Sequence, residues 1–545
     1  MSAPTFDYII VGAGAAGAIL ADRLSEDGRH SVCLLEAGPP DWHPFLHIPA
    51  GFIKVLFDPA FTWTFSTEPT HWTDGRRIPV PQGRTLGGST SMNGLVYNRG
   101  QPEDFDDWAE RGGSGWSYKE VLPYFQRSER YAGGEDRFRG RNGRMPVSDL
   151  EWIHPICEQF IAGAQELGMP RTPDYNGASQ AGVGYFQRII EGRWRMSTSR
   201  TFLREARRRS NLTIITRAQA SAVLFEGGRA VGVRYHLGAR GEVEQIVRAT
   251  REVVLSCGAA NTPKLLQLSG VGPADQLGAW GIPVVVNSPG VGAQLSDHYG
   301  VRLVAQSKGV ATINELSRAP RLWGQIAAWL LGKPSMLAVS PSLVHWFWQS
   351  RPGLNRPDLQ GVFAPASYRK GYLGMLDEYP GMTCGVWQHR PYSRGHVRLQ
   401  SRDFREAPLI QPNYLDDERD RDVLLGGMKI ARQLLQTSAL SRYFEVETLP
   451  GAEVQTDDEL LDYARRVGAS SYHLNGSVRM GAMDDAGAVV DPELRVKGVA
   501  GLRVADASVM PSIVSANTCA ATMMIAEKAA DLIRGKAPLS PATLP

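Results

Sequence analysis

The N-terminal segment FDYIIVGAGAAGAILADRLSEDGRHSVCLLEAG constrains the fold more than any other part of the chain. Its β-branched run Asp7–Val11 predicts a buried parallel strand. In the glycine motif that follows, Gly12 allows a tight turn, Gly14 lets the backbone approach a pyrophosphate, and Gly17 lets a helix pack closely on the strand. The next strand is expected to end at Glu36. This order predicts a parallel α/β sheet with a nucleotide site at the start of the helix.

The identity of the nucleotide depends on the other end of the chain. Glu36 suits the hydroxyls of an adenosine ribose and disfavours the extra phosphate of NADP, but it fits both NAD and FAD. Near the C-terminus, Leu502–Ala505 predicts a strand that is followed by Asp506, a loop and a helix. Flavoproteins often return to the nucleotide domain with such a strand, whose Asp reaches the ribityl and pyrophosphate region. We therefore expect FAD.

Length and composition limit the class of protein. A chain of 545 residues predicts two or more domains, and 43% hydrophobic with 21% charged residues is typical of a soluble globular protein. The net charge of +3 gives no indication of a nucleic-acid partner. No apolar run approaches the ~18 residues of a transmembrane helix. The five cysteines form no CxxC pair, so neither a disulfide framework nor a metal site is expected. A cytoplasmic location follows as an expectation.

Three further segments are informative together. GRTLGGSTSMNGLVYNRG begins at Gly83, GAANTPKLLQLSGVGP begins at Gly258, and SYHLNGSVRMG runs from Ser471 to Gly481. With the N-terminal motif, they give a sequence that resembles the glucose–methanol–choline (GMC) oxidoreductase family over Phe6–Gly535, and most of all its bacterial choline-dehydrogenase-like branch. The run RPYSRGHVRLQSRD looks like a strand of the family's substrate sheet.

The resemblance implies an α/β fold with an α+β substrate domain. A discontinuous, Rossmann-like FAD-binding domain would comprise residues 1–150, 197–297 and 468–537. A β-sheet substrate domain covering the flavin would comprise residues 151–196 and 298–467. The tail, residues 538–545, is expected to be flexible because it is rich in proline and small polar residues. The oligomeric state is not predicted.

The family's motifs also indicate which residues would hold the cofactor. The expected FAD-binding residues are Gly12, Gly14, Ala15, Gly17, Glu36, Ala37, Arg84, Gly87, Gly88, Thr90, Asn93, Gly94, Ala220, Gly258, Asp506, Ala507, Asn517 and Thr518. Some members attach the flavin covalently through a histidine. This chain has Met92 at that position, so the resemblance implies non-covalent FAD.

His473 is the expected catalytic base for alcohol oxidation. The family's stretch reads His-Pro-x-Gly-Thr, and here Leu474 and Ser477 replace the proline and the threonine. Neutral imidazole can take a hydroxyl proton near neutral pH. The partner position is Asn517, whose amide could hold the substrate oxygen. By contrast, His298 lies in a turn that the family uses to link the domains, and a structural role is expected for it.

The substrate is expected to be an uncharged primary alcohol, with oxygen or another electron acceptor. Choline-oxidising members carry a carboxylate in a strand over the flavin, and no Asp or Glu occurs here between Ser335 and Ser350. The aligned residues Leu343, His345 and Phe347 are expected to line the substrate pocket. The apolar and aromatic residues of this run, Leu343, Trp346, Phe347 and Trp348, favour a benzylic or medium-chain alcohol over choline.

Two alternatives remain at this stage. A flavin photoenzyme or lyase could use the same scaffold, and the changes at Leu474 and Ser477 leave room for it. A non-catalytic flavin-binding protein is the other possibility. Retention of both His473 and Asn517 speaks against that second reading.

Overall fold

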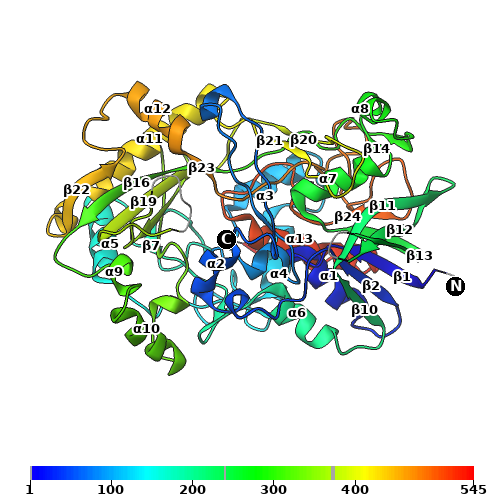
Figure 1. Ribbon diagram of the computed structural model, residues 1–545, viewed down its shortest axis with the longest axis horizontal. Helices are drawn as coiled ribbons and strands as arrows, with labels where there is room; N and C mark the ends of the chain where they lie inside the picture. The colour runs from blue at the N-terminus through cyan, green and yellow to red at the C-terminus, as the bar shows by residue number, and fades with distance from the viewer. Residues whose placement is uncertain (1–2, 239–240, 370–374, 545) are drawn as a thin grey trace.

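Two β-sheets dominate the computed structural model, which describes residues 3–238, 241–369 and 375–544 (Figure 1). The strands of the first sheet lie in the order β10-β2-β1-β13-β12-β11, and β24 pairs with β13. Strands β10, β2, β1, β13 and β24 are parallel, whereas β11 and β12 extend the sheet as antiparallel strands. Their bounds are β1 Thr5–Val11, β2 Val32–Glu36, β10 Leu212–Thr216, β11 Ala218–Glu226, β12 Arg229–Leu237, β13 Val243–Leu255 and β24 Leu502–Val504.

Helices pack on this first sheet because its strands are apolar on both faces. Ile9, Ile10 and Leu34 are fully buried, as expected for a parallel sheet between helices. Helix α1 follows β1 directly and lies against α13, which is formed by the last part of the chain (Figure 1). The helices of this half are α1 Ala15–Ser25, α3 Pro102–Glu110, α4 Tyr118–Ser128, α6 Thr198–Ala206, α7 Gly258–Leu268, α8 Ala274–Ala279 and α13 Thr518–Ile533.

The second sheet has the order β22-β16-β19-β18-β17-β7, with β23 beside β16. Its neighbours along this path pair in antiparallel fashion. Its strands are β7 Gly182–Tyr185, β16 Tyr299–Ser307, β17 Val344–Trp348, β18 Leu359–Ala364, β19 Gly381–Gln388, β22 Phe444–Leu449 and β23 Ala469–Ser470. The expected domain division assigned residues 469–470 to the FAD domain, but they pair with the second sheet. Otherwise the division stays a proposal.

One face of the second sheet is covered by helices. Leu303, Cys384 and Phe363 form a buried row across three adjacent strands, and Phe160 stacks on Phe363 at 4.0 Å between ring centroids. The helices of this half are α2 Phe52–Val55, α5 Pro155–Glu166, α9 Ile313–Leu316, α10 Arg321–Leu330, α11 Glu418–Leu435 and α12 Asp457–Val467. Because successive side chains of a strand point to opposite faces, the residues on either side of this row point to the other face of the sheet.

Several two-stranded ribbons lie outside the two large sheets. One of them contains the run that was expected to form a strand of the substrate sheet. The run after Arg390 forms β20, which pairs only with β21 instead of joining the second sheet. The ribbons are β3 Thr62–Trp63 with β4 Gln82–Gly83, β5 Glu129–Arg130 with β6 Met145–Pro146, β8 Ile190–Glu191 with β9 Trp194–Arg195, β14 Val271–Gly272 with β15 Val286–Asn287, and β20 His396–Arg398 with β21 Leu409–Gln411.

The C-terminal segment is docked, so the expectation of a flexible tail was wrong for its described part. The amide of Leu539 donates to the Tyr124 hydroxyl at 3.2 Å, and the amide of Ala542 donates to the Lys119 carbonyl at 2.7 Å. Leu539, Ala542 and Leu544 also pack against the core of the first half. Apolar residues spaced along the tail therefore offset its turn-forming composition.

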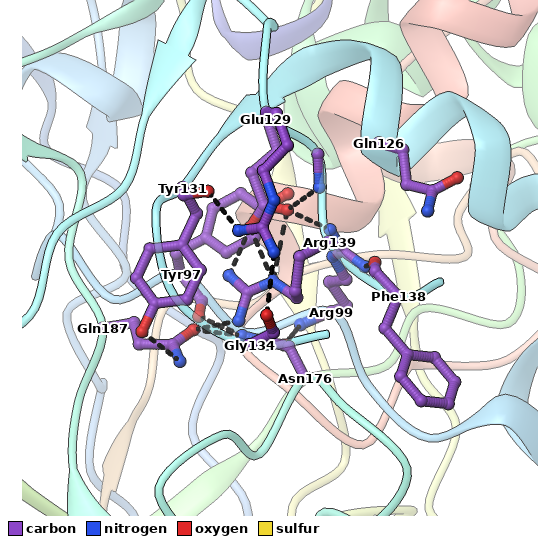
Figure 2. Close-up of polar contacts among 12 residues, drawn as sticks. Tyr97, Arg99, Gln126, Glu129, Tyr131, Gly134, Phe138, Arg139, Asn176 and Gln187 are labelled. Carbon is purple, nitrogen blue, oxygen red and sulfur yellow. Dashed lines mark hydrogen bonds and ion pairs between the residues drawn. The ribbon is translucent and has the colours of Figure 1, made fainter. Parts of the chain in front are cut away.

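A buried charge network fixes the segment before the second sheet (Figure 2). The Glu129 carboxylate pairs with the guanidinium groups of Arg99 and Arg139, and all three side chains are at most 1% exposed. Arg139 also donates to Asp174 at 2.5 Å and to Gln187 at 2.9 Å. Since every charge has a partner, this network, which we call the Glu129 network, holds α4, β5 and the following loops in one arrangement.

Candidate active site

A cavity of about 1120 Å³ lies between the two sheets. At one end it is lined by the glycine loops after β1 and around residue 88. At the other end it is lined by the face of the second sheet that the helices leave free. This volume exceeds the usual range for a drug-sized ligand. It therefore has room for a dinucleotide and a second small molecule.

The glycine loops approach so closely that only glycine fits. A Cβ atom on Gly17 would lie 1.8 Å from the Gly12 carbonyl oxygen, and Gly12 itself has a φ of +98°. A Cβ on Gly88 would lie 2.6 Å from the Cα of Gly14. The loop at residue 88 and the loop after β1 thus form one cradle of backbone, open to the cavity. A pyrophosphate is the group that such a cradle accommodates.

Two carboxylates organise the cradle. Glu36 is 5% exposed and accepts hydrogen bonds from the amides of Ala13 at 2.9 Å and Gly38 at 2.8 Å. Burial raises the pKa of Glu36 to about 7. Hydroxyl donors from a ribose would further stabilise its charged form. Asp506 accepts from the Gly258 amide at 2.8 Å and from Thr262 at 2.6 Å, so its carboxylate ties the C-terminal segment to α7.

Arg195 supports the second glycine loop, although its sequence context gave no indication of this. Its buried guanidinium donates to the Thr90 carbonyl at 3.3 Å and to Asn93 Oδ1 at 3.0 Å. Burial lowers the pKa of Arg195 to about 9. The Thr90 hydroxyl also bonds with Thr198 at 3.1 Å. The side chains of Thr90 and Asn93 are therefore held in place from outside the cavity.

Most of the expected cofactor residues meet at this cavity. Those that line it are Gly12, Gly14, Ala15, Glu36, Ala37, Gly88, Thr90, Asn93, Gly94, Ala220, Gly258, Asp506, Ala507, Asn517 and Thr518. Gly17, Arg84 and Gly87 are not among the lining residues. Gly17 acts on the helix packing, and Arg84 lies 4.7 Å from the ring centroid of Trp63. Met92 lines the cavity and is 2% exposed.

His473 lies in a directed chain of hydrogen bonds. Its Nδ1 is 2.9 Å from Nδ1 of His298, and Nε2 of His298 is 2.8 Å from the His389 carbonyl oxygen. A carbonyl only accepts, so His298 carries its proton on Nε2 and offers a bare Nδ1 to the proton on His473 Nδ1. His473 Nε2 then carries the lone pair, which accepts a hydrogen bond from the side-chain amide nitrogen of Asn517, 3.1 Å away.

Asp297 fixes the backbone of the catalytic segment. It accepts hydrogen bonds from the amides of His473 at 2.7 Å and His298 at 2.9 Å. The hydroxyls of Ser470 and Tyr414 also donate to it. Burial raises its pKa to about 6. A single carboxylate therefore holds both histidines at the distance at which their rings meet.

Both histidines are held neutral. Burial lowers the pKa of His298 to about 4, and burial together with the charge of His298 lowers the pKa of His473 well below its usual range. A neutral His473 with its lone pair on Nε2 can accept a proton. The Asn517 amide beside it is oriented by Gln360, which donates to Asn517 Oδ1 at 3.1 Å. The pair can therefore bind a hydroxyl group as acceptor and donor at once.

The free face of the second sheet forms the substrate end of the cavity. Its register places three rows side by side: Gln360, Trp387 and Gly300; then Val362, Gly385 and Arg302; then Ala364, Thr383 and Val304. All of these residues line the cavity. The first row is next to His473 and Asn517, which we call the catalytic pair. Gln360 donates to Asn517, and the Trp387 ring centroid lies 6.2 Å from that of His473.

Leu343, His345 and Phe347 do not line the cavity, which corrects the expectation of a pocket role. All three are at most 1% exposed. Phe347 is buried in a cluster with Val96 and Phe186, and these two residues take its place at the cavity wall. The rings of Tyr175 and Phe186 pack against His345, and these contacts could not be inferred from the sequence of strand β17 itself. Pro341 and Ser342, just before it, do line the cavity.

His298 was expected to be structural, and the structure shows that it directly contacts His473. Its neighbour Asp297 was the available signal, because a buried acid before a histidine indicates an organised polar site. Gln360 and Arg302 gave no comparable signal. Their position on the cavity face depends on strand register. Among the described residues, no cluster of His, Cys, Asp or Glu could hold a metal ion, and no helix is long and apolar enough to cross a membrane.

Comparison with known proteins identifies the family. The N-terminal and C-terminal domain profiles of GMC oxidoreductases match residues 6–300 and 391–526, respectively. The chain belongs to the GMC oxidoreductase family. An oxygen-dependent choline dehydrogenase of Rhizobium etli is 39% identical over 98% of this chain and 96% of its own length. A protein of the same name from Vibrio vulnificus is 40% identical over 98% and 95%, respectively.

Solved structures of two oxidases share the fold. Pyridoxine 4-oxidase from Mesorbium loti is 28% identical with a TM-score of 0.87, over 97% of this chain and 99% of its own. Formate oxidase from Aspergillus oryzae is 26% identical with a TM-score of 0.91, over 98% and 99%, respectively. The family and the glycine cradle both indicate FAD as the cofactor. This GMC protein is an FAD-dependent oxidoreductase that acts on alcohol-type substrates.

Proposed function

We propose that the protein oxidises an uncharged primary alcohol to an aldehyde in preference to choline. One observation carries the proposal. Among the described residues that line the cavity, the only carboxylates are Glu36 and Asp506, both at the dinucleotide end. A quaternary ammonium group at the substrate end would find no counter-charge, and aromatic contacts would contribute only about 0.5–2 kcal/mol.

In this proposal His473 is the general base. Its Nε2 lone pair accepts the hydroxyl proton, and the Asn517 amide donates to the same oxygen as negative charge develops on it. FAD, held by the residues of the cradle, would supply the acceptor for the hydride of the carbinol carbon and the route of its electrons to oxygen or another acceptor. His298 stabilises the imidazolium because its bare Nδ1 accepts the Nδ1 proton of His473.

FAD would be held by the residues of the cradle without a covalent bond. Met92 offers a thioether at the position where some family members carry the attaching histidine, and its side chain packs with Leu46 and Val55. Denaturation of the purified protein should therefore release all of its FAD into the supernatant. Flavin that stays with the precipitated protein would contradict this part of the proposal.

The changes at Leu474 and Ser477 give no reason to propose a lyase or a photoenzyme. Leu474 is 5% exposed and packs in a cluster that includes Leu295 and Ile410. Ser477 donates to the Ala259 carbonyl at 2.6 Å. Both residues thus serve the packing around the catalytic segment, while the contact between His473 and Asn517 is retained.

The deciding experiment is an anaerobic reduction of the bound flavin by a panel of alcohols. Benzyl alcohol and medium-chain primary alcohols should bleach the flavin faster than choline at equal concentration. The same panel with oxygen or with an artificial acceptor then shows which acceptor is used. Rapid bleaching by choline, with benzyl and alkyl alcohols inert, would overturn the proposed preference.

A further inference from the structure

Arg302 is an unpaired cation in the substrate end of the cavity. It lies on β16, opposite Gly385 of β19, and its side chain is solvent-accessible within the cavity lining. Among the described residues, no carboxylate forms an ion pair with it, and its guanidinium donates no hydrogen bond. Two other described arginines line the cavity: Arg369 pairs with Glu378 at 2.6 Å, and Arg76 donates to the carbonyls of Arg465 and Gly468. Arg302 therefore offers a free guanidinium to whatever enters the cavity.

The position of Arg302 relative to the catalytic pair follows from the register. Gly300, two residues earlier on β16, belongs to the row that is next to His473 and Asn517. Two residues of a strand advance by about 7 Å. The guanidinium carbon of Arg302 lies 5.6 Å from the ring centroid of Tyr368, which joins the cavity wall beyond the catalytic row. A ligand that reaches both His473 and Arg302 must carry its two functional groups at opposite ends.

The neighbours of Arg302 leave room for such a ligand. Gly385 has no side chain on the cavity face, and a Cβ atom there would come within 3.6 Å of the Arg302 Cγ. The Tyr472 hydroxyl is buried without a hydrogen-bond partner among the described residues. Burial raises the pKa of Tyr472, and the nearby charge of Arg302 opposes this rise. Tyr472 has a φ of +65°, in the left-handed region that favours glycine.

We propose that Arg302 anchors a carboxylate on the substrate, so that the preferred alcohols are primary alcohols with a carboxylate at their far end. This inference rests on the proposed alcohol oxidation and narrows its substrate: uncharged alcohols remain better substrates than choline, and a carboxylate at the far end improves them further. A guanidinium binds a carboxylate through two parallel hydrogen bonds, which are stronger than bonds between neutral groups. The carboxylate is separated from the hydroxymethyl group by a benzene ring or a chain of similar length. One guanidinium matches a monoanionic carboxylate better than a phosphate dianion.

The test uses three alcohols with one benzyl frame: 4-(hydroxymethyl)benzoate, benzyl alcohol and the 4-trimethylammonium derivative of benzyl alcohol. The order of kcat/KM in the holoenzyme should be carboxylate, then neutral, then quaternary ammonium. Arg302→Gln should lower kcat/KM for the carboxylate by about 10- to 100-fold, mainly through KM. Benzyl alcohol should be oxidised almost as before. Arg302→Glu should reverse the order of the two charged substrates.

Arg369→Gln is the matched control, because it removes a cation from the same end of the cavity. It should leave the ratio of carboxylate to neutral substrate nearly unchanged. Equal losses of kcat/KM for the carboxylate substrate in Arg302→Gln and Arg369→Gln would show that only the electrostatic potential of the cavity matters. That result would overturn the role of Arg302 as an anchor. Failure of all three alcohols to react would instead overturn the proposed oxidation itself.

A measurement on the unmodified holoenzyme keeps the inference testable if the variants do not fold. 4-Methylbenzoate and 4-methylbenzamide have the same shape and differ in charge, and neither has a hydroxyl to oxidise. As competitive inhibitors of benzyl alcohol oxidation, the benzoate should bind at least about tenfold more tightly. Equal or weaker binding of the benzoate would contradict a carboxylate anchor.

Discussion

The Glu129 network and the chain around His473 are both buried polar clusters, but they end differently. In the first, the Glu129 carboxylate pairs with both guanidinium groups (Figure 2). None of these three residues lines the cavity. In the second, neutral groups donate in one direction, from Asn517 through His473 and His298 to the His389 carbonyl, and the end formed by Asn517 and His473 lines the cavity. Closed pairing fixes a structure, whereas an open end leaves a group available for a ligand. Arg302 belongs to the second kind.

The largest effect should come from removing the open end. His473→Ala should lower kcat by more than the roughly 10²–10⁴-fold expected for a general base, because orientation of the hydroxyl is lost as well. FAD content should be unchanged, since His473 is outside the glycine cradle. Asn517→Ala should cost less. The measurement is anaerobic flavin reduction in a stopped-flow instrument, and near-normal rates in His473→Ala would refute its role as the base.

Breaking the closed network should act on stability instead. Glu129→Gln leaves Arg99 and Arg139 buried without their full counter-charge, which should cost about 3–5 kcal/mol in the free energy of unfolding. The rate of alcohol oxidation per bound flavin should not change. The control is Glu191→Gln, whose partner Arg130 is on the surface, with 48% and 46% of the two side chains exposed. That change should cost less than about 1 kcal/mol. Equal denaturation midpoints for the two variants would contradict the comparison.

A change in the middle of the open chain should have an intermediate effect on rate. His298→Ala removes the acceptor for the His473 Nδ1 proton, and turnover should fall by about 10- to 100-fold. In His298→Gln, a side-chain carbonyl oxygen can accept that proton, so part of the rate should return. A merely structural role would predict no such recovery. Thermal melting of both variants separates loss of packing from loss of the hydrogen bond.

The smallest effect concerns pH. A protonated His473 cannot act as a base, so kcat/KM should fall as the pH drops through its pKa. Burial lowers that pKa, which moves the fall below the ordinary value of about 6.5 for histidine. The rate with benzyl alcohol should therefore stay constant as the pH falls to about 6.5. An apparent pKa above about 6.5 in the pH profile would show that the His473 imidazole is not held neutral.

The sequence predicted the local motifs of this protein better than their contacts. The first strand, its glycine turn and Glu36 could be read from the chain because each requirement is local. The same holds for the strand before Asp506. The roles of His298 and Arg302 could not be read in this way, because they depend on which strands pair and in what register. His345 was wrongly expected in the pocket for a similar reason, since Tyr175 and Phe186, far away in the sequence, pack against its ring.

The pairing of β24 with β13 has a consequence for how the protein is made. Strand β1 emerges first from the ribosome, but the last parallel strand of its sheet and Asp506 are synthesised some five hundred residues later. Contacts at such sequence separation form slowly, because the ends of a long loop must meet. The nascent chain therefore completes its cofactor cradle only after β24 and Asp506 have been synthesised. Cofactor loading is a late step, and a chain truncated before residue 502 lacks part of the cradle and α13.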